Sequence, residues 1–288
     1  MDTPKTKIKV AGQDSIWEKV QKSRHPDRPH CLDLLKTLCN NIIELHGDRN
    51  HFDDSALVCG LATLKENANS PMRKLVFIGQ QKGRKTQDKI KRNFGMAHPE
   101  GYKKAIRFFK LAEKFNLPIL SFIDTPGAYP GIEAEKRGQS YNIALSTMSM
   151  LECSSPIVSI VAGEGGSGGA LAIGVPDKLI MFSNSTYSVI SPESCASILW
   201  KDAAHSKKAA QALKLSAQNS HRFKICDHII KEPEEGLQLS NLEVISPSLL
   251  QQIHTFYEEL SSISNEKRIE NRLTKYRKIG TEFIRSQS

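Results

Sequence analysis

The sequence lacks several features that would place the protein in a special class. It has no run of about 18 apolar residues, so no transmembrane helix is predicted. Its first residues, MDTPKTKIKVAG, are polar and lack the apolar core of a secretory signal. Its 6 cysteines contain no C-x-x-C pair, so their spacing indicates neither a zinc site nor a redox pair. We expect them to be reduced core residues of a cytosolic protein.

No internal repeat or low-complexity tract is present either. The 288 residues, of which 39% are hydrophobic, are enough for one large domain or two smaller domains with a real core. The formal net charge of +9 favours an anionic partner, such as a nucleotide-bearing cofactor, an acidic protein or nucleic acid. The charge alone does not choose among these partners.

One stretch, Ile157–Gly174, organises the rest of the chain. Ile157–Val161 is apolar and rich in β-branched residues, which predicts a buried strand. Five glycines follow within Gly163–Gly169, and the small apolar residues after them suit a helix that packs closely on a sheet. Such a glycine turn lets backbone N–H groups point at a ligand, either to hold an anion or to stabilise one that forms in a transition state.

A dinucleotide site is the first interpretation of this turn. Gly163, Gly165 and Gly168 match the G-x-G-x-x-G fingerprint. The fingerprint requires an acidic ribose-binding residue about 20 residues further on. The corresponding region, Phe182–Ser188, contains no acid, which disfavours this interpretation.

Two other interpretations concern catalysis. Gly165–Gly169 matches G-x-S-x-G, which would make Ser167 the nucleophile of a serine hydrolase. Candidate partners in the required order are Asp202 or Asp227 and His205, His221 or His228. The alternative is a pair of backbone amides that stabilises an oxyanion without a side-chain nucleophile. That alternative explains why glycine also surrounds Ser167, whereas close helix–sheet packing alone needs only one or two glycines.

A second strand and loop support the amide pair. Leu117–Ile123 is predicted to be a buried strand that ends in the Pro/Gly loop Asp124–Gly131, and Glu133–Leu151 is the expected crossover helix. A right-handed crossover places both loops at the same edge of the sheet. One amide from Ala128 and one from Gly168–Gly169 can then converge on a single oxygen.

Hydrophobic periodicity predicts the remaining elements. Helices are expected around Ile16–Val20 and at Cys31–Leu45, Tyr102–Phe115, Lys207–Leu215, Leu249–Leu260 and Arg268–Phe283, with another beginning at Ser191; strands are expected at Ala56–Leu64, Lys74–Gly79, Leu179–Phe182, Thr186–Ile190 and Cys226–Lys231. Gly47 is the expected C-cap of the helix from Cys31. In the helix from Tyr102, Lys103, Lys104 and Lys110 are expected to face outward.

Three charged segments leave alternatives open. Asp53-Asp54 has no third ligand nearby, so a turn or capping role is favoured over a metal site. The basic segment Gln80–Asn93 fits a solvated face and an anion-binding loop equally well. The basic helix Arg268–Phe283 has no interleaved aromatic residues for base stacking, so a charged outer face is favoured over a nucleic-acid site.

Several motifs together resemble a known family. They are Asn93–Met96, Ile123–Gly131, Arg137–Gln139, Gly163–Gly174 and Ala196–Trp200, flanked by Glu44–Arg49 and Gln81–Arg84. This set resembles the carboxyltransferase α subunits of bacterial and plastid acetyl-CoA carboxylase, over roughly Arg24 to Pro233. The chain departs from the family pattern in a shortened N-terminal helical segment, in a serine for the usual glycine at Ser194, and in Glu232–Gly236, where a Gly-Gly-Ala-His run is usual.

The resemblance implies a fold and a domain organisation. The expected fold is α/β, a crotonase-like (ClpP/crotonase) spiral of ββα units with flanking N- and C-terminal helices. The expected parts are an N-terminal extension at residues 1–30, the carboxyltransferase domain at 31–245 and C-terminal helices at 246–288.

The resemblance also implies an activity and partners. Together with a β subunit, in an α2β2 complex, the chain would transfer the carboxyl group from carboxybiotin on the biotin carboxyl carrier protein to acetyl-CoA. The product, malonyl-CoA, feeds fatty-acid synthesis. A biotin carboxylase partner would use ATP, and zinc would lie only on the β subunit. Neither a membrane span nor a nucleic-acid partner is expected, and the location would be the bacterial cytoplasm or the plastid stroma.

Site residues follow from the same resemblance. The catalytic groups would be the backbone N–H of Ala128 with that of Gly168 or Gly169. Gly127, Gly165 and Gly166 would let the backbone approach biotin, Ser167 would be a helix N-cap, and Lys82 and Arg84 would attract carboxylate or phosphate groups; no metal ligand is expected.

Overall fold

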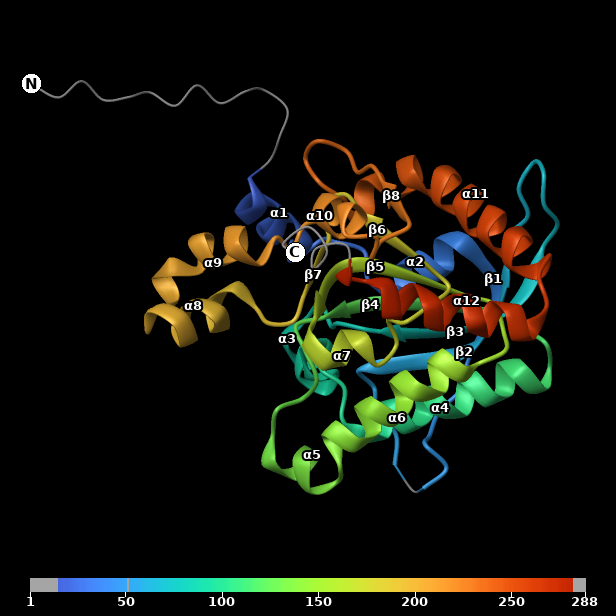
Figure 1. The fold of residues 1–288 in the computed structure, drawn as a ribbon, viewed down its shortest axis with the longest axis horizontal. Helices are drawn as coiled ribbons and strands as arrows, with labels where there is room; N and C mark the ends of the chain where they lie inside the picture. Colours follow the sequence, from blue (N-terminus) through green and yellow to red (C-terminus); the bar gives the residue numbers. More distant parts are fainter. Residues whose placement is uncertain (1–14, 51, 282–288) are drawn as a thin grey trace, which may run out of the picture.

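A computed structural model describes residues 15–50 and 52–281 (Figure 1). One 8-stranded sheet has the order β1-β2-β3-β4-β5-β6-β8, and β7 pairs with the end of β5. The strands are β1 Cys39–Glu44, β2 Leu57–Leu64, β3 Arg73–Gln80, β4 Ile119–Thr125, β5 Ile157–Gly166, β6 Lys178–Phe182, β7 Thr186–Ser188 and β8 His228–Ile230. The strands predicted from the sequence are all present, and β1 is additional.

Helices cover both faces of this sheet (Figure 1). The α-helices are α1 Ile16–Ser23, α2 Cys31–Leu38, α3 Thr86–Lys91, α4 Pro99–Lys114, α5 Ile132–Lys136, α6 Gln139–Glu152, α7 Ser167–Leu171, α8 Pro192–Trp200, α9 Ser206–Leu213, α10 Ala217–Arg222, α11 Leu242–Ser261 and α12 Asn265–Lys278. Among the described helices, none combines the length and the apolar character that crossing a membrane requires. The predicted features within residues 1–14, and the end of the predicted last helix beyond residue 281, lie outside the described residues.

The sheet changes direction at β3. β1, β2 and β3 pair antiparallel, whereas β3, β4, β5, β6 and β8 pair parallel. Parallel pairing places the carboxyl ends of β3, β4 and β5 at one edge, which is where the Pro/Gly loop and the glycine turn were expected to meet.

The prediction of one helix over Cys31–Leu45 is wrong in its second half. The helix ends at Leu38, and Cys39–Glu44 forms β1 at the edge of the sheet, antiparallel to β2. The backbone is already extended at Cys39, and pairing with β2 supplies the hydrogen bonds instead of a helix. Asn41, with a positive φ of 50°, lies at the irregularity in this pairing between Asn40 and Ile43. Gly47, with φ of 83°, therefore lies in the turn after a strand and is not a helix C-cap.

The predicted helix over Glu133–Leu151 is also divided. α5 ends at Lys136 and α6 begins at Gln139, because Gly138 takes a left-handed φ of 79° between them. A left-handed residue cannot continue a right-handed helix, and glycine adopts it without steric cost.

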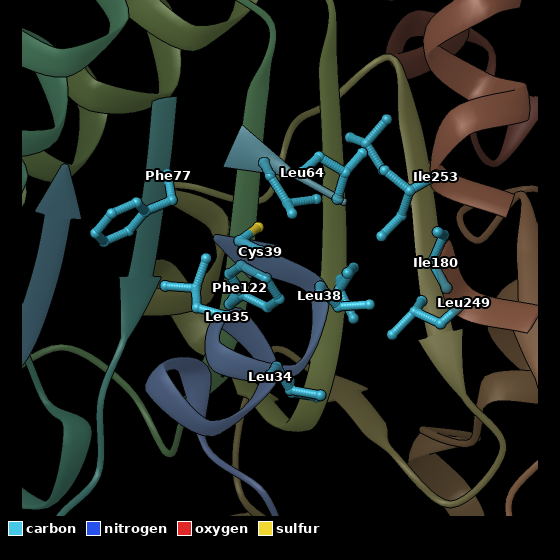
Figure 2. Packing of buried hydrophobic residues seen from close by; sticks show 14 of the residues in the cluster. Leu34, Leu35, Leu38, Cys39, Leu64, Phe77, Phe122, Ile180, Leu249 and Ile253 are labelled. Atoms are coloured by element: carbon cyan, nitrogen blue, oxygen red, sulfur yellow. The ribbon is translucent and has the colours of Figure 1, made fainter. Parts of the chain in front are cut away.

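Two hydrophobic clusters fill the space between sheet and helices. Along β4, Leu120 and Phe122 point to one face, and Ile119 and Ile123 to the other. The first face packs against α2 and α11, and Figure 2 shows Leu34, Leu35 and Leu38 of α2 and Leu249 and Ile253 of α11 in this layer. The second face packs against α4, α6 and α7. The sheet is therefore covered on both sides, as a parallel sheet requires.

Lys104 does not face outward as predicted. It is 1% exposed, and its Nζ lies 2.5 Å from the Asp53 carboxylate and 2.8 Å from the Asp54 carbonyl oxygen. Asp53 also accepts the N–H of Gly47, and Asp54 accepts that of Ala56. Of the turn or capping role expected for the two aspartates, the turn role is confirmed, and Lys104 turns inward because their turn supplies acceptors for it.

The predicted charged outer face of the last helix is only partly correct. Arg268 and Arg272 of α12 are buried at 4% and 1% exposure. Arg272 makes a bidentate ion pair with Asp177, at 2.8 Å for both bonds, and donates to the carbonyl oxygens of Met150 and Cys153. The end of α6 exposes these carbonyls and so draws the guanidinium into the interface.

This ion pair generates a prediction about stability. Arg272→Met removes one partner and leaves the Asp177 carboxylate buried without its counter-charge, which should lower the free energy of unfolding by about 3–5 kcal/mol. Denaturant unfolding measures the change. Lys267→Met is the matched control on the same helix, because Lys267 makes only an exposed pair with Glu270, and it should cost less than about 1 kcal/mol. Equal effects of the two substitutions would contradict this account of α12.

Candidate functional site

The glycine turn begins later than the sequence predicts. β5 continues through Gly166, because Glu164, Gly165 and Gly166 pair in parallel with Thr186–Ser188 of β7. A side chain at position 165 is excluded, since its Cβ would lie 2.4 Å from the ring of Tyr187. The first glycines of the motif therefore serve strand packing, and the turn itself is confined to Gly166–Gly169.

Ser167 is not the predicted N-cap. It is the first residue of α7, with a left-handed φ of 53°, and Gly166 occupies the cap position. The side chain is exposed, and in the described ranges no histidine or carboxylate is hydrogen-bonded to it. Two of the proposed triad partners are engaged elsewhere: His221 Nδ1 lies 3.0 Å from the Cys226 carbonyl oxygen, and Asp227 accepts the N–H of Leu179. A serine nucleophile thus lacks a base.

The two loops meet backbone to backbone. An added Cβ on Gly169 would lie 2.5 Å from the backbone nitrogen of Ala128, and one on Gly166 would lie 2.1 Å from the Pro126 carbonyl oxygen. Gly168 has more room, because its Cβ would be 3.4 Å from the nearest atom, a methyl of Ile143. The structure therefore brings Ala128 and Gly169 together, as the crossover argument predicts.

The amides at this junction are available to a ligand. In the described part of the chain, the N–H of Ala128 has no protein acceptor. Gly168 and Gly169 belong to the first turn of α7, where backbone N–H groups have no acceptor within the helix. Two such donors that converge on one oxygen can stabilise a negative charge that develops there.

Side chains that the sequence analysis did not single out hold the first of these loops. Thr125 Oγ1 accepts the N–H of Gly127 at 3.1 Å and donates to its carbonyl oxygen at 2.6 Å. Gln139 is buried, and its Nε2 donates to the carbonyl oxygens of Tyr129 and Ala97, both at 2.9 Å. The Ala128 amide is thus fixed on both sides. Two features of the sequence could have indicated the roles of these side chains: Thr125 ends a predicted strand, and Gln139 belongs to the motif Arg137–Gln139.

The predicted anion-attracting residues lie beside the junction and are paired within the chain. Lys82 Nζ lies 2.8 Å from Asp124 and 2.9 Å from Glu164. Arg84 pairs with Asp33 at 2.5 Å and is further from the loops. Attraction of carboxylate or phosphate groups by these two residues stays a prediction, and the paired geometry gives Lys82 a structural role as well.

Charge balance sets the protonation of this cluster. Burial raises the pKa of Glu164, but Lys82 and Arg24 outweigh burial and lower it below its usual value. Burial lowers the pKa of Lys82, and its two carboxylate partners reverse the direction and raise it. Both groups are therefore charged at neutral pH, and the ion pair ties β3 to the start of the glycine turn.

Two depressions flank the junction. A polar cavity of about 250 Å³ lies on the α1 side and includes Arg24, His30, Lys82 and Glu164 in its lining. An open apolar depression of about 540 Å³ lies on the α6 side, beside Gly168, and its lining is Ser140, Ile143, Ala144, Thr147, Met148, Leu151, Gly168 and Leu171. The amide of Gly168 thus borders an apolar surface.

The cluster around Lys82 predicts a pH-dependent loss of stability. Lys82→Met should lower the free energy of unfolding by about 3–5 kcal/mol at pH 7, because two carboxylates lose their counter-charge. A lowered pKa makes Glu164 stabilising above about pH 4.5 in the wild type, and this contribution disappears as pH falls. In the variant the Glu164 pKa rises, so the difference between the two proteins should shrink as pH approaches about 4.5.

Denaturant unfolding at several pH values measures this trend. Lys85→Met is the control, since Lys85 is exposed on the same segment and should change stability by no more than about 0.5 kcal/mol. A difference between the Lys82 variant and wild type that grows on acidification would contradict the ion-pair account.

Comparison with known proteins assigns the chain to a family. The profile of the family described as acetyl co-enzyme A carboxylase carboxyltransferase-like matches residues 3–280. An acetyl-coenzyme A carboxylase carboxyl transferase subunit alpha from Prochlorococcus marinus is 49% identical over 267 residues, which cover 92% of this chain and 78% of the relative. The protein of the same name from Campylobacter hominis is 54% identical over 228 residues, which cover 79% of this chain and 71% of the relative.

A solved structure supports the fold. The transcarboxylase 12S crystal structure superposes with a TM-score of 0.65 at 15% identity, over 88% of this chain and 46% of that chain. At this identity the likeness shows the fold alone, and it confirms the predicted crotonase-like α/β class. With a family profile over most of its length and close relatives that it largely covers, the chain belongs to the acetyl-coenzyme A carboxylase carboxyltransferase-like family.

Proposed function

We propose that this chain is the α half of a biotin-dependent carboxyltransferase. Together with a β subunit it transfers a carboxyl group from carboxybiotin on a carrier protein to acetyl-CoA, which gives malonyl-CoA for fatty-acid synthesis. The names of the relatives support the reaction. The observation that assigns the reaction to this site is the close approach of Ala128 and Gly169, where backbone amides of two loops lie near each other without protein acceptors among the described residues.

The chemistry requires such amides. When the carboxyl group leaves N1′ of carboxybiotin, the carbon–nitrogen bond breaks and negative charge develops on the ureido oxygen. The enolate of acetyl-CoA then forms the new carbon–carbon bond, and the proton from its methyl group goes to the biotin nitrogen. No side-chain nucleophile is needed. Each donor to such an oxygen typically lowers the barrier by about 3 kcal/mol. The N–H groups of Ala128 and of Gly168 or Gly169 would therefore supply a large share of the stabilisation of the transition state.

Each remaining residue of the site has a role in this proposal. Gly166 keeps the two loops close, because a side chain there would strike Pro126, and Gly165 keeps β5 close to Tyr187. A Cβ at Gly127 would meet no atom within 4 Å, so we assign the open space beside Gly127 to the approach of biotin. We also assign the attraction of the anionic carboxybiotin and CoA to Lys82 and Arg84, each of which is paired with carboxylates within the chain.

The apolar depression on α6 favours a protein partner at this edge. Met148 and Leu171, both in its lining, are 51% and 43% exposed, and large apolar side chains grouped on a surface mark interaction sites. We assign this surface to the β subunit, which would bring acetyl-CoA and its own zinc. An α2β2 assembly, a carrier protein and an ATP-using biotin carboxylase complete the proposed system, located in the bacterial cytoplasm or the plastid stroma.

Reconstitution tests this proposal. The purified chain is mixed with a candidate β subunit, and carboxyl transfer from malonyl-CoA to biocytin is measured, with each chain alone as the control. We expect activity only in the mixture. Activity of this chain alone would contradict the division of labour, and an assembled complex without activity would contradict the assignment of acetyl-CoA as the substrate.

The two neighbouring glycines give a matched pair of variants. Gly169→Ala places a Cβ 2.5 Å from the Ala128 nitrogen and should reduce kcat by about 100-fold, because it forces the two loops apart. Gly168→Ala meets only Ile143 at 3.4 Å and keeps its N–H, so its kcat should stay within about threefold of wild type. Similar rates in both variants would contradict the geometry of the amide pair.

Ser167→Ala separates the amide pair from the serine-hydrolase alternative. An exposed hydroxyl without a base contributes little, so the variant should keep at least about one third of the wild-type rate. Labelling of Ser167 by a fluorophosphonate, or loss of activity by several orders of magnitude with the complex intact, would revive the nucleophile.

A further inference from the structure

Gln80 joins the two loops of the site through one side chain. It is the last residue of β3 and is fully buried at 0% exposure. Its Nε2 donates to the carbonyl oxygen of Gly169 at 2.7 Å, and its Oε1 accepts the backbone N–H of Asp124 at 3.0 Å. Asp124 lies at the end of β4 and leads into the loop of Ala128, and Gly169 lies in α7, so a single side chain contacts both segments that carry the proposed oxyanion donors.

The carbonyl of Gly169 depends on this contact. Past the end of α7, the N–H of Ala172 donates to Gly168 and that of Ile173 donates to Ala170. Within the described residues, the oxygen of Gly169 therefore receives no backbone donor after the helix ends, and Gln80 supplies the hydrogen bond. An unpaired buried carbonyl is costly and would turn toward another donor.

We propose that Gln80 is a positioning residue for carboxyl transfer. By holding the Gly169–Ala170 peptide and the Asp124 amide at fixed positions, it sets the separation of the Ala128 and Gly169 N–H groups without touching the substrate. This inference rests on the proposed function of those amides. The position needs one donor and one acceptor at the same time, which a carboxamide supplies and an ionised carboxylate or an apolar side chain does not.

The ion pairs of Lys82 do not make Gln80 redundant. Lys82 links the side chains of Asp124 and Glu164, whereas Gln80 links backbone groups, one of which belongs to the turn of α7 itself. Side-chain pairs leave the rotation of a peptide free, and a direct hydrogen bond to its carbonyl oxygen does not. The two devices therefore fix different parts of the same junction.

Gln81 offers a control next in the sequence. It is also buried, at 7% exposure, and makes two hydrogen bonds, from the Leu32 N–H and to the Lys82 carbonyl oxygen, both at 2.9 Å. The first bond holds the start of α2, the second holds the backbone of the neighbouring Lys82, and neither reaches the loop of Ala128 or the turn of α7. Gln81→Met thus removes the same kind of interaction from the same strand end as Gln80→Met, away from the amide pair.

Steady-state kinetics of the reconstituted complex test the proposal. Gln80→Met should lower kcat by about 100-fold while KM for malonyl-CoA stays within about threefold, because transition-state geometry is lost and substrate binding is kept. Gln81→Met should lower the melting temperature by a similar amount and keep kcat within about twofold. Once ionised, the carboxylate of Gln80→Glu keeps the acceptor for Asp124 but loses the donor to Gly169, so its kcat should fall as pH rises and the carboxyl group loses its proton.

The possible outcomes separate the two claims. Near-normal kcat in Gln80→Met, with wild type active and Gly169→Ala inactive, would overturn the positioning role and leave the proposed function standing. An inactive wild-type mixture would overturn both. If Gln80→Met does not assemble by gel filtration, the shorter apolar variant Gln80→Leu, which can make neither hydrogen bond, decides: kcat close to that of Gln81→Met would overturn the proposal, and a loss near 100-fold would support it.

Discussion

The close approach of two backbone segments is the constraint on which the rest of this site depends. The loop after β4 and the turn after β5 leave no room for a Cβ at Gly166 or Gly169, so the chain there consists of bare peptide groups. Parallel pairing of β4 with β5 places both loops at the same edge of the sheet. The pairing has a register shift between Ile123 and Thr125, just before the two loops meet. Amides presented in this way need no reorganisation when charge develops, which is the property an oxyanion site requires.

Charged pairs flank this neutral junction and hold it. Lys82, Arg24 and Glu164 form a network that reaches α8 through the pair of Arg24 with Glu193. In Figure 1 the α8–α9 hairpin extends away from the sheet, and this network links that arm to the site. A buried pair, of Arg28 with Glu232 at 2.8 Å, holds the start of the segment Glu232–Gly236. Charges here bind elements to one another, while the reacting oxygen would meet only backbone N–H groups.

Much of this could be predicted from the sequence because it follows from local pattern. Apolar runs gave the parallel strands, and glycine at fixed spacing indicated where the backbone must come close. The failures came from long-range partners. Cys39–Glu44 has helical periodicity and becomes a strand only because β2 offers an open edge. Lys104 and Arg272 are charged residues on helices, and their burial depends on acceptors more than 50 residues away in the sequence. Ser167 is not the N-cap because pairing with β7 extends β5 through Gly166. Gln80 belongs to no sequence motif that predicts its two hydrogen bonds, to Gly169 and Asp124.

The most direct test of the account is a structure of the complex with a β subunit and bound biotin, in which the position of the ureido oxygen is measured. The account predicts that this oxygen lies about 3 Å from the backbone nitrogen of Ala128 and from that of Gly168 or Gly169, with no side-chain donor required. A ureido oxygen held instead by the Ser167 hydroxyl or by Lys82, with the Ala128 amide more than about 4 Å away, would contradict it.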